Sequence, residues 1–70
     1  MIKCNLRKIC FDKDIRSISE LQRITGISRP TLYKLFDNKD VNTIKFESID
    51  VICNKLNINL DDLVEHVPEK

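Results

Sequence analysis

The side chains best suited to bind another molecule lie in a short run that follows Gly26, the only glycine of the chain. This run contains Arg29, Thr31, Tyr33 and Lys34. An arginine guanidinium can donate two parallel hydrogen bonds to N7 and O6 of a guanine, and a lysine ammonium can reach the same acceptors. Threonine and tyrosine add hydroxyl and apolar contacts. These residue types therefore suit the edges of base pairs, provided that one surface presents them together.

A helix over residues 29–37 would provide that surface. At about 100° per residue, Leu32 and Leu35 define its inner face, and Tyr33 and Lys34 lie on the opposite side. An α-helix fits the major groove of DNA, where every base pair displays a distinct pattern of donors and acceptors. We therefore predict four base-reading residues: Arg29, Thr31, Tyr33 and Lys34.

Contacts to the DNA backbone are expected around the starts of two short helices. The unpaired amide groups at a helix N-terminus bind phosphate readily. Such contacts orient a protein on the duplex and carry no sequence information of their own. The residues predicted for this role are Ser17, Ser19, Arg23, Ser28 and Lys39.

Capping residues predict both helices. Ser19 and Gln22 have the spacing of a capping box, which predicts that a helix begins at Ser19, and Gly26 suits the left-handed residue that ends it. Ser28 is a good N-cap for the next helix, whose first turn tolerates Pro30. A turn this short sets two helices at a large angle. The apolar wedge expected between them consists of Leu21, Ile27, Leu32 and Leu35.

Three more helices are predicted from apolar residues at helical spacing. The first runs from about Asn5, its N-cap, to Lys13. After a loop over residues 39–45, a fourth runs from Phe46 to about Asn57. Asn59 caps a fifth helix over residues 60–65, whose buried side is expected to hold Leu60, Leu63 and Val64.

The two ends of the chain are predicted to be extended. Residues 66–68 end at a proline, which disfavours a helical residue before it, and they can pair with residues 2–4 as a minimal two-stranded sheet. The three phenylalanines are expected in the core or at its rim: Phe11, Phe36 and Phe46.

The composition indicates one small helical domain over residues 1–70. Apolar residues make up 41% of the chain and charged residues 33%, with one glycine and two prolines, which is typical of a globular helical protein. The chain opens without a signal-peptide pattern, and no apolar run approaches the ~20 residues of a membrane span. We therefore expect a cytoplasmic protein without a membrane partner.

Chemistry by cysteine, histidine or a metal is not indicated. The sequence contains no C-x-x-C pair among its three cysteines, Cys4, Cys10 and Cys53, so neither a disulfide framework nor a zinc site is expected. We expect these thiols to be buried or half-buried. His66, the only histidine, has no nucleophile or carboxylate arranged around it. The sequence thus predicts no catalytic residues, no metal and no cofactor.

Charge is distributed unevenly along the chain, although the net charge is only +1. Through Lys39 there are nine basic and four acidic residues, a balance of +5, and from Asp40 onward there are three basic and seven acidic ones, a balance of −4. The basic part contains both helices of the predicted pair. Such a molecule can turn one face toward phosphates.

The unit from Ser19 to Leu35 resembles the helix-turn-helix of phage-repressor and Cro-type regulators, also called XRE-like. The residues that carry the resemblance are Ser19-Glu20-Leu21, Thr25-Gly26-Ile27-Ser28, Leu32 with Leu35, and Leu60-Asp61-Asp62-Leu63. The resemblance implies an all-α, five-helix, lambda-repressor-like bundle with the helix-turn-helix at helices 2 and 3. It also implies a repressor-like transcriptional regulator of a phage or prophage, which binds double-stranded DNA, usually as a homodimer on a palindromic operator.

A second function stays open: an antirepressor or co-repressor that binds another helix-turn-helix regulator and alters its DNA binding. Asp37 lies on the predicted reading face, and Gln22 stands where the family usually has a small alanine. With the acidic second part of the chain, these residues could engage the basic face of a DNA-binding partner. The operator, the sign of regulation and the dimer surface are likewise open.

Overall fold

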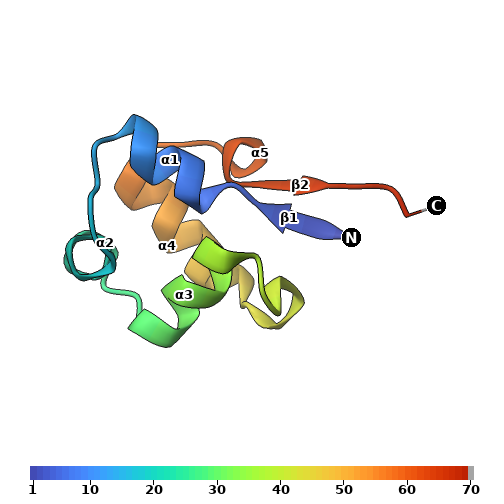
Figure 1. Ribbon diagram of the computed structural model, residues 1–70, viewed down its shortest axis with the longest axis horizontal. Coiled ribbons are helices and arrows are strands. Elements are labelled where there is room, and N and C mark those ends of the chain that lie inside the picture. Colours follow the sequence, from blue (N-terminus) through green and yellow to red (C-terminus); the bar gives the residue numbers. More distant parts are fainter. Residues whose placement is uncertain (70) are drawn as a thin grey trace.

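The computed structural model describes residues 1–69, so Lys70, the last residue of the predicted domain, lies outside the described residues. The elements are β1 (Ile2–Cys4), α1 (Leu6–Asp12), α2 (Ile18–Thr25), α3 (Arg29–Asp37), the 3-10 helix η1 (Val41–Thr43), α4 (Phe46–Leu56), α5 (Leu60–Leu63) and β2 (Val64–His66). The two strands run side by side out of the helical bundle (Figure 1). The predicted all-α fold is confirmed, with the helix-turn-helix at α2 and α3. No helix within residues 1–69 has the length and apolarity to cross a membrane.

The core is built from one apolar stripe of each helix. Its fully buried side chains are Leu6, Leu21, Leu32, Leu35, Ile52 and Leu63. The predicted wedge is therefore confirmed, because three of its residues belong to this set and half-buried Ile27 packs against the same core. The wedge joins α2 and α3 to the rest of the bundle.

The start of α2 differs from the prediction. The N-cap is Ser17, whose Oγ accepts a hydrogen bond from the backbone N–H of Glu20 at 3.1 Å, so the predicted start at Ser19 and its capping box with Gln22 are wrong. Ser17 and Glu20 are three residues apart, as are Ser19 and Gln22, the pair predicted to form the capping box. The helix begins earlier because Ile18 is half-buried and packs against the core.

The end of α2 is as predicted. Gly26 has a φ of +73°, a left-handed conformation that costs glycine little, and its N–H donates to the carbonyl oxygen of Gln22. Thr25 is buried beside it. The Thr25 hydroxyl donates to the carbonyl oxygen of Leu21 at 2.9 Å and accepts from the N–H of Ile27 at 3.2 Å. The polar group is thereby satisfied inside the core, and it braces the turn.

The terminal strands pair two residues earlier than predicted. β2 is antiparallel to β1, with Ile2 opposite His66 and Cys4 opposite Val64. Helix α5 consequently ends at Leu63, because the next residues are already extended and paired. Asn59 caps α5 as predicted, whereas the Asn5 side chain makes no capping hydrogen bond to α1. The predicted loop over residues 39–45 contains η1.

Three apolar side chains lie on the surface against expectation. Phe11 is 84% exposed, Phe46 is 86% exposed and Leu60 is 54% exposed. Phe11 lies beside the buried stripe of α1, and Phe46 is the first residue of α4, where the bundle ends. Phe36 is half-buried as expected, with the guanidinium carbon of Arg7 4.7 Å from the centre of its ring.

The three cysteines have the predicted surroundings. Cys4 and Cys10 are buried and Cys53 is half-buried. Burial is the main cause that raises the pKa of each of these thiols above its ordinary value. They therefore remain protonated near neutral pH, and a protonated thiol is a poor nucleophile.

Asn38 links the end of α3 to the terminal sheet. Its φ of +56° ends α3 in the left-handed conformation. Its side-chain Oδ1 accepts a hydrogen bond from the N–H of Cys4, and its Nδ2 donates to the carbonyl oxygen of Cys4 at 2.9 Å. The amide thus satisfies the edge of β1 that faces away from β2.

We predict that Asn38→Gly lowers the free energy of unfolding by about 1–2 kcal/mol, because it removes both hydrogen bonds and keeps the left-handed conformation. Asn38→Ala should cost about 1 kcal/mol more, because alanine strains that conformation. Urea denaturation measures both. Asn57→Gly is the matched control, since Asn57 ends α4 with a φ of +54°. Equal effects of Asn38→Gly and Asn57→Gly would contradict the role of the amide.

Candidate nucleic-acid interface

The predicted reading residues lie along the outer side of α3, directly after a tight turn. In Figure 1 α2 lies at the edge of the bundle opposite the two strands, and α3 runs from beside α2 back toward β1. Arg29 is the first residue of α3, and Pro30 follows in its first turn as predicted. Leu32 and Leu35 are fully buried, whereas Tyr33 is 49% exposed and Lys34 is exposed. The helix therefore has the predicted inner and outer faces.

Arg29 is held by two residues of α2. Its Nε donates a hydrogen bond to Oε1 of Gln22 at 2.9 Å, and its Nη2 donates to Oγ of Ser19 at 2.8 Å. Arg29 and Ser19 are exposed, and Gln22 is half-buried. The guanidinium is thus an exposed group in a defined place that bridges the two helices.

The other three candidates on α3 are less firmly held. Nζ of Lys34 lies 3.4 Å from Oγ1 of Thr43 in η1, a long contact between exposed groups. Thr31 is half-buried, and its hydroxyl accepts a hydrogen bond from Oγ of Ser28 at 3.1 Å. The side chain of Tyr33 is exposed. Lys34 and Thr31 can exchange their contacts for those of a bound molecule.

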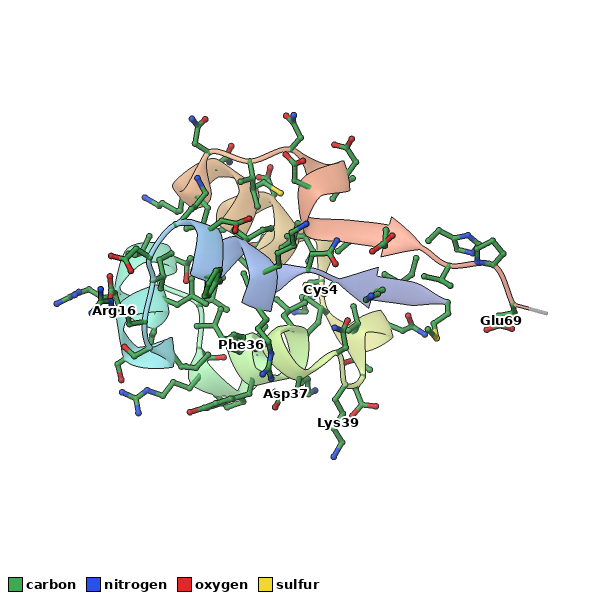
Figure 2. All side chains as sticks on the ribbon, turned by 45° about the horizontal axis from the view of Figure 1, so that its top comes forward. Cys4, Arg16, Phe36, Asp37, Lys39 and Glu69 are labelled. Atoms are coloured by element: carbon green, nitrogen blue, oxygen red, sulfur yellow. The ribbon has the colours of Figure 1, made fainter. Side chains whose placement is uncertain are left out.

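The candidates for phosphate binding lie at both ends of the two helices, with Ser17, Ser19 and Ser28 near the helix starts, Arg23 in the last turn of α2 and Lys39 after the end of α3. Ser17 is the N-cap of α2 and Ser28 is the N-cap of α3. Arg23 and Lys39 are exposed, and Figure 2 shows Lys39 extending away from the body of the molecule. The hydroxyls of all three serines already have partners: Ser17 accepts from the N–H of Glu20, Ser19 accepts from Arg29, and Ser28 donates to Thr31. The structure therefore joins Ser19 and Ser28 to candidate base-reading residues.

Asp37, the acidic residue of the predicted reading face, has a basic partner. Its Oδ1 lies 3.0 Å from Nη2 of Arg7 on α1, and the guanidinium of the same arginine lies over the ring of Phe36. The pair is exposed, so it contributes little to stability. It does place a positive charge against the carboxylate, which reduces the repulsion that Asp37 would exert on a polyanion.

Gln22 and Thr43 are the residues of this surface that sequence reasoning missed. Each contacts a predicted base-reading residue: Gln22 accepts a hydrogen bond from Arg29, and Thr43 accepts a long one from Lys34. Periodicity within one helix cannot find such pairs, because both contacts cross a turn. The available signal was the long polar side chain of Gln22, seven residues before Arg29 and on the outer side of the turn.

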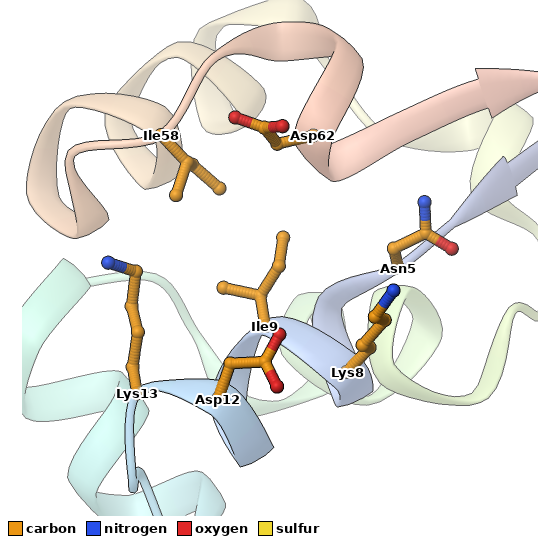
Figure 3. A pocket seen from close by; sticks show the side chains of 7 residues that line it. All are labelled: Asn5, Lys8, Ile9, Asp12, Lys13, Ile58 and Asp62. Atoms are coloured by element: carbon orange, nitrogen blue, oxygen red, sulfur yellow. The ribbon is translucent and has the colours of Figure 1, made fainter.

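A separate hollow of about 360 Å³ lies between α1 and the start of α5 (Figure 3). Its lining residues are Asn5, Lys8, Ile9, Asp12, Lys13, Ile58 and Asp62. Ile58 points toward Ile9 across its middle. None of these residues belongs to α2 or α3. Among residues 1–69 there is also no cluster of histidine, cysteine and carboxylate side chains that could hold a metal ion.

Comparison with known families finds a match over most of the chain. A model of the Cro/C1-type HTH DNA-binding domain matches residues 5–69, a range that includes α1 to α5 and β2. No curated protein matches the chain. The family match thus extends over the candidate interface and over the helices that support it.

Proposed function

Because the chain belongs to the Cro/C1-type HTH DNA-binding family, we propose that it is a sequence-specific transcriptional regulator that reads an operator through α3. The family match supports a DNA-binding regulator. The finer proposal depends on one observation, the exposed outer face of α3 that begins with Arg29. The prophage origin expected from the resemblance stays a prediction.

In this proposal α3 enters the major groove with its N-terminal part toward the bases. Arg29 donates to guanine, and Lys34 releases Thr43 to reach a second acceptor. The half-exposed ring of Tyr33 and the methyl group of Thr31 can contact a thymine methyl. A single docking geometry can serve Arg29, Tyr33 and Lys34, which are exposed, whereas half-buried Thr31 lies at the edge of this face, close to the buried side of Leu35.

Phosphate contacts would hold that geometry. Ser17 and Ser28 stand at helix starts, where amide groups and the helix dipole favour an anion. Arg23 and Lys39 add positive charge at exposed positions. The part of the chain that contains α1, α2 and α3 has the excess of basic residues. In this proposal the protein represses transcription by covering a promoter, because this mechanism requires only that the protein binds DNA.

A homodimer on a two-fold operator is part of the proposal, and an apolar surface supports it. We name it the β1–α5 face; its residues line a hollow of about 260 Å³ and are Ile2, Val41, Asn42, Ile44, Phe46, Ile49, Leu60 and Val64. The exposed ring of Phe46 stands at the rim of this hollow. In a two-fold contact the same patch of both subunits meets, so the patch must be complementary to itself. The β1–α5 face offers a hollow and the exposed ring of Phe46, which can enter the hollow of a second copy. Lys45 and Glu47 flank Phe46 with opposite charges that such a contact can pair.

The antirepressor alternative is weaker on one specific point. It was motivated in part by Asp37 on the reading face. The contact of Asp37 with Arg7 at 3.0 Å offsets that negative charge. We therefore place DNA, rather than the basic face of another regulator, as the proposed partner of α3.

We predict that the protein retards duplex DNA from the promoter region of its own gene in a mobility-shift experiment. The logarithm of the binding constant should fall linearly with the logarithm of the salt concentration, with a slope of about −0.9 for each phosphate neutralised. Absence of retardation at low salt would contradict operator binding. Retardation only in the presence of a second regulator would favour the antirepressor function.

Substitutions should separate base reading from backbone contact. Arg29→Ala or Lys34→Ala should weaken binding to the preferred site by about 1–3 kcal/mol and relax its sequence preference. Arg23→Ala should weaken binding to all sequences alike and reduce the salt slope by about 1. Titrations of preferred and scrambled duplexes measure both effects. A uniform loss for Arg29→Ala would assign that residue to phosphate.

The homodimer is tested by Phe46→Ser, with Phe11→Ser as the matched control. Both rings are more than four-fifths exposed, so neither change should affect folding. In sedimentation equilibrium, with and without operator DNA, Phe46→Ser should weaken self-association and Phe11→Ser should leave it unchanged. Equal behaviour of the two variants would exclude the β1–α5 face as the dimer surface.

A further inference from the structure

We propose that Gln22 and Ser19 are positioning residues, which hold Arg29 so that it reads a guanine in preference to other bases. The inference rests on the proposed function, operator reading by α3. It assigns a role in sequence specificity to two residues of α2, the helix that is not itself expected to enter the groove. The contact that carries it is the pair of hydrogen bonds from Arg29 to α2.

The shape of the guanidinium group gives these two bonds a consequence. The group is planar and has two edges, each with two parallel N–H donors. The side edge consists of the N–H of Nε and one N–H of Nη2, and the end edge consists of the other N–H of Nη2 and one of Nη1. In Arg29 both nitrogens of the side edge donate, Nε to Gln22 and Nη2 to Ser19. Within residues 1–69 Nη1 has no hydrogen-bond acceptor, and Nη2 keeps a second N–H for the end edge.

The end edge is sufficient for base recognition. A fork of two parallel donors matches N7 and O6 of guanine, whereas adenine offers a donor in place of O6. Arg29 therefore keeps the donors that discriminate guanine while α2 holds the other side of the group. Both acceptors on α2 are neutral, so the full positive charge of the arginine is retained for the DNA.

The hydrogen bonds also restrict Arg29 before DNA arrives. An exposed arginine loses much rotamer freedom when it is ordered at an interface, and this loss lowers affinity. An arginine that is already held loses less. Ser19 and Gln22 lie three residues apart on one face of α2 and so form a single platform beside the first turn of α3. The long side chain of Gln22 thus has a use at a position where alanine could not reach Arg29.

The test compares Gln22→Met combined with Ser19→Ala against the wild-type protein and Arg29→Ala. Methionine keeps the length of glutamine and removes the acceptor. Each full-length variant selects from a pool of duplexes with a randomised core, and the bound DNA is sequenced. We expect the wild-type protein to prefer guanine at one position, Arg29→Ala to lose this preference, and the double variant to weaken it roughly 2- to 10-fold at that position alone.

Two further measurements separate positioning from stability. Gln22→Glu keeps an acceptor, so it should retain the guanine preference while its charge weakens binding to all sequences. In the free protein, the Nε–H of Arg29 should exchange with water more slowly than that of Arg23, and Gln22→Met should remove the difference. The exchange measurement needs no DNA.

The outcomes are distinguishable. A wild-type protein that selects no sequence would overturn the proposed function and this inference with it. A guanine preference that is lost in Arg29→Ala but kept in the double variant would overturn the inference alone. Equal exchange of the two arginines in the free protein would overturn it as well.

Discussion

The arrangement of this surface depends on the packing of α2 against α3 around Leu21, Leu32 and Leu35, which are fully buried. Only a tight bend at Gly26 lets two helices of eight and nine residues meet over so small a wedge. Once the inner face of α3 is fixed in this way, its outer face follows from helical geometry. The exposed positions of Arg29 and Lys34 are therefore a consequence of the core, and no separate device is needed to present them.

Polar groups reinforce the same geometry from both sides of the turn. Inside, the hydroxyl of Thr25 bridges the last turn of α2 and the N–H of Ile27. Outside, Arg29 bridges α3 and α2 through Gln22 and Ser19. Both Thr25 and Gln22 look like poor choices when each helix is considered alone. Both residues are explained by a partner on the other side of the turn. Thr25 accepts a hydrogen bond from the N–H of Ile27, and Gln22 accepts one from Arg29.

The sequence predicted the elements whose signals are local. Gly26, Asn38 and Asn57 end helices in the left-handed conformation, and this preference belongs to the residue itself. The stripes of α3 and α4 likewise follow from spacing within one helix. Of the proposed site, sequence reasoning therefore located the exposed face of α3, but it did not find the partners of Arg29 and Lys34.

What could not be predicted depends on neighbours that are distant in the chain. Phe46 has the spacing of a core residue, yet it is exposed because the bundle ends beside it. The end of α5 depends on pairing of Val64–His66 with a strand at the other terminus. The start of α2 required a choice between two serines with equal capping chemistry, and the contact of Ile18 with the core decided it.

The two arginine contacts of α3 also explain how a nearly neutral chain can offer a basic surface. At the start of α3, Arg29 binds neutral oxygens, so its charge remains available. At the end of α3, the charge of Asp37 is opposed by Arg7, a residue of α1. The acidic excess lies after Asp40, mainly in α4, α5 and β2. The part of the chain through Lys39 consequently carries a balance of +5, which is more positive than the net charge of +1, and a phosphate meets mainly the charges within a Debye length of the surface.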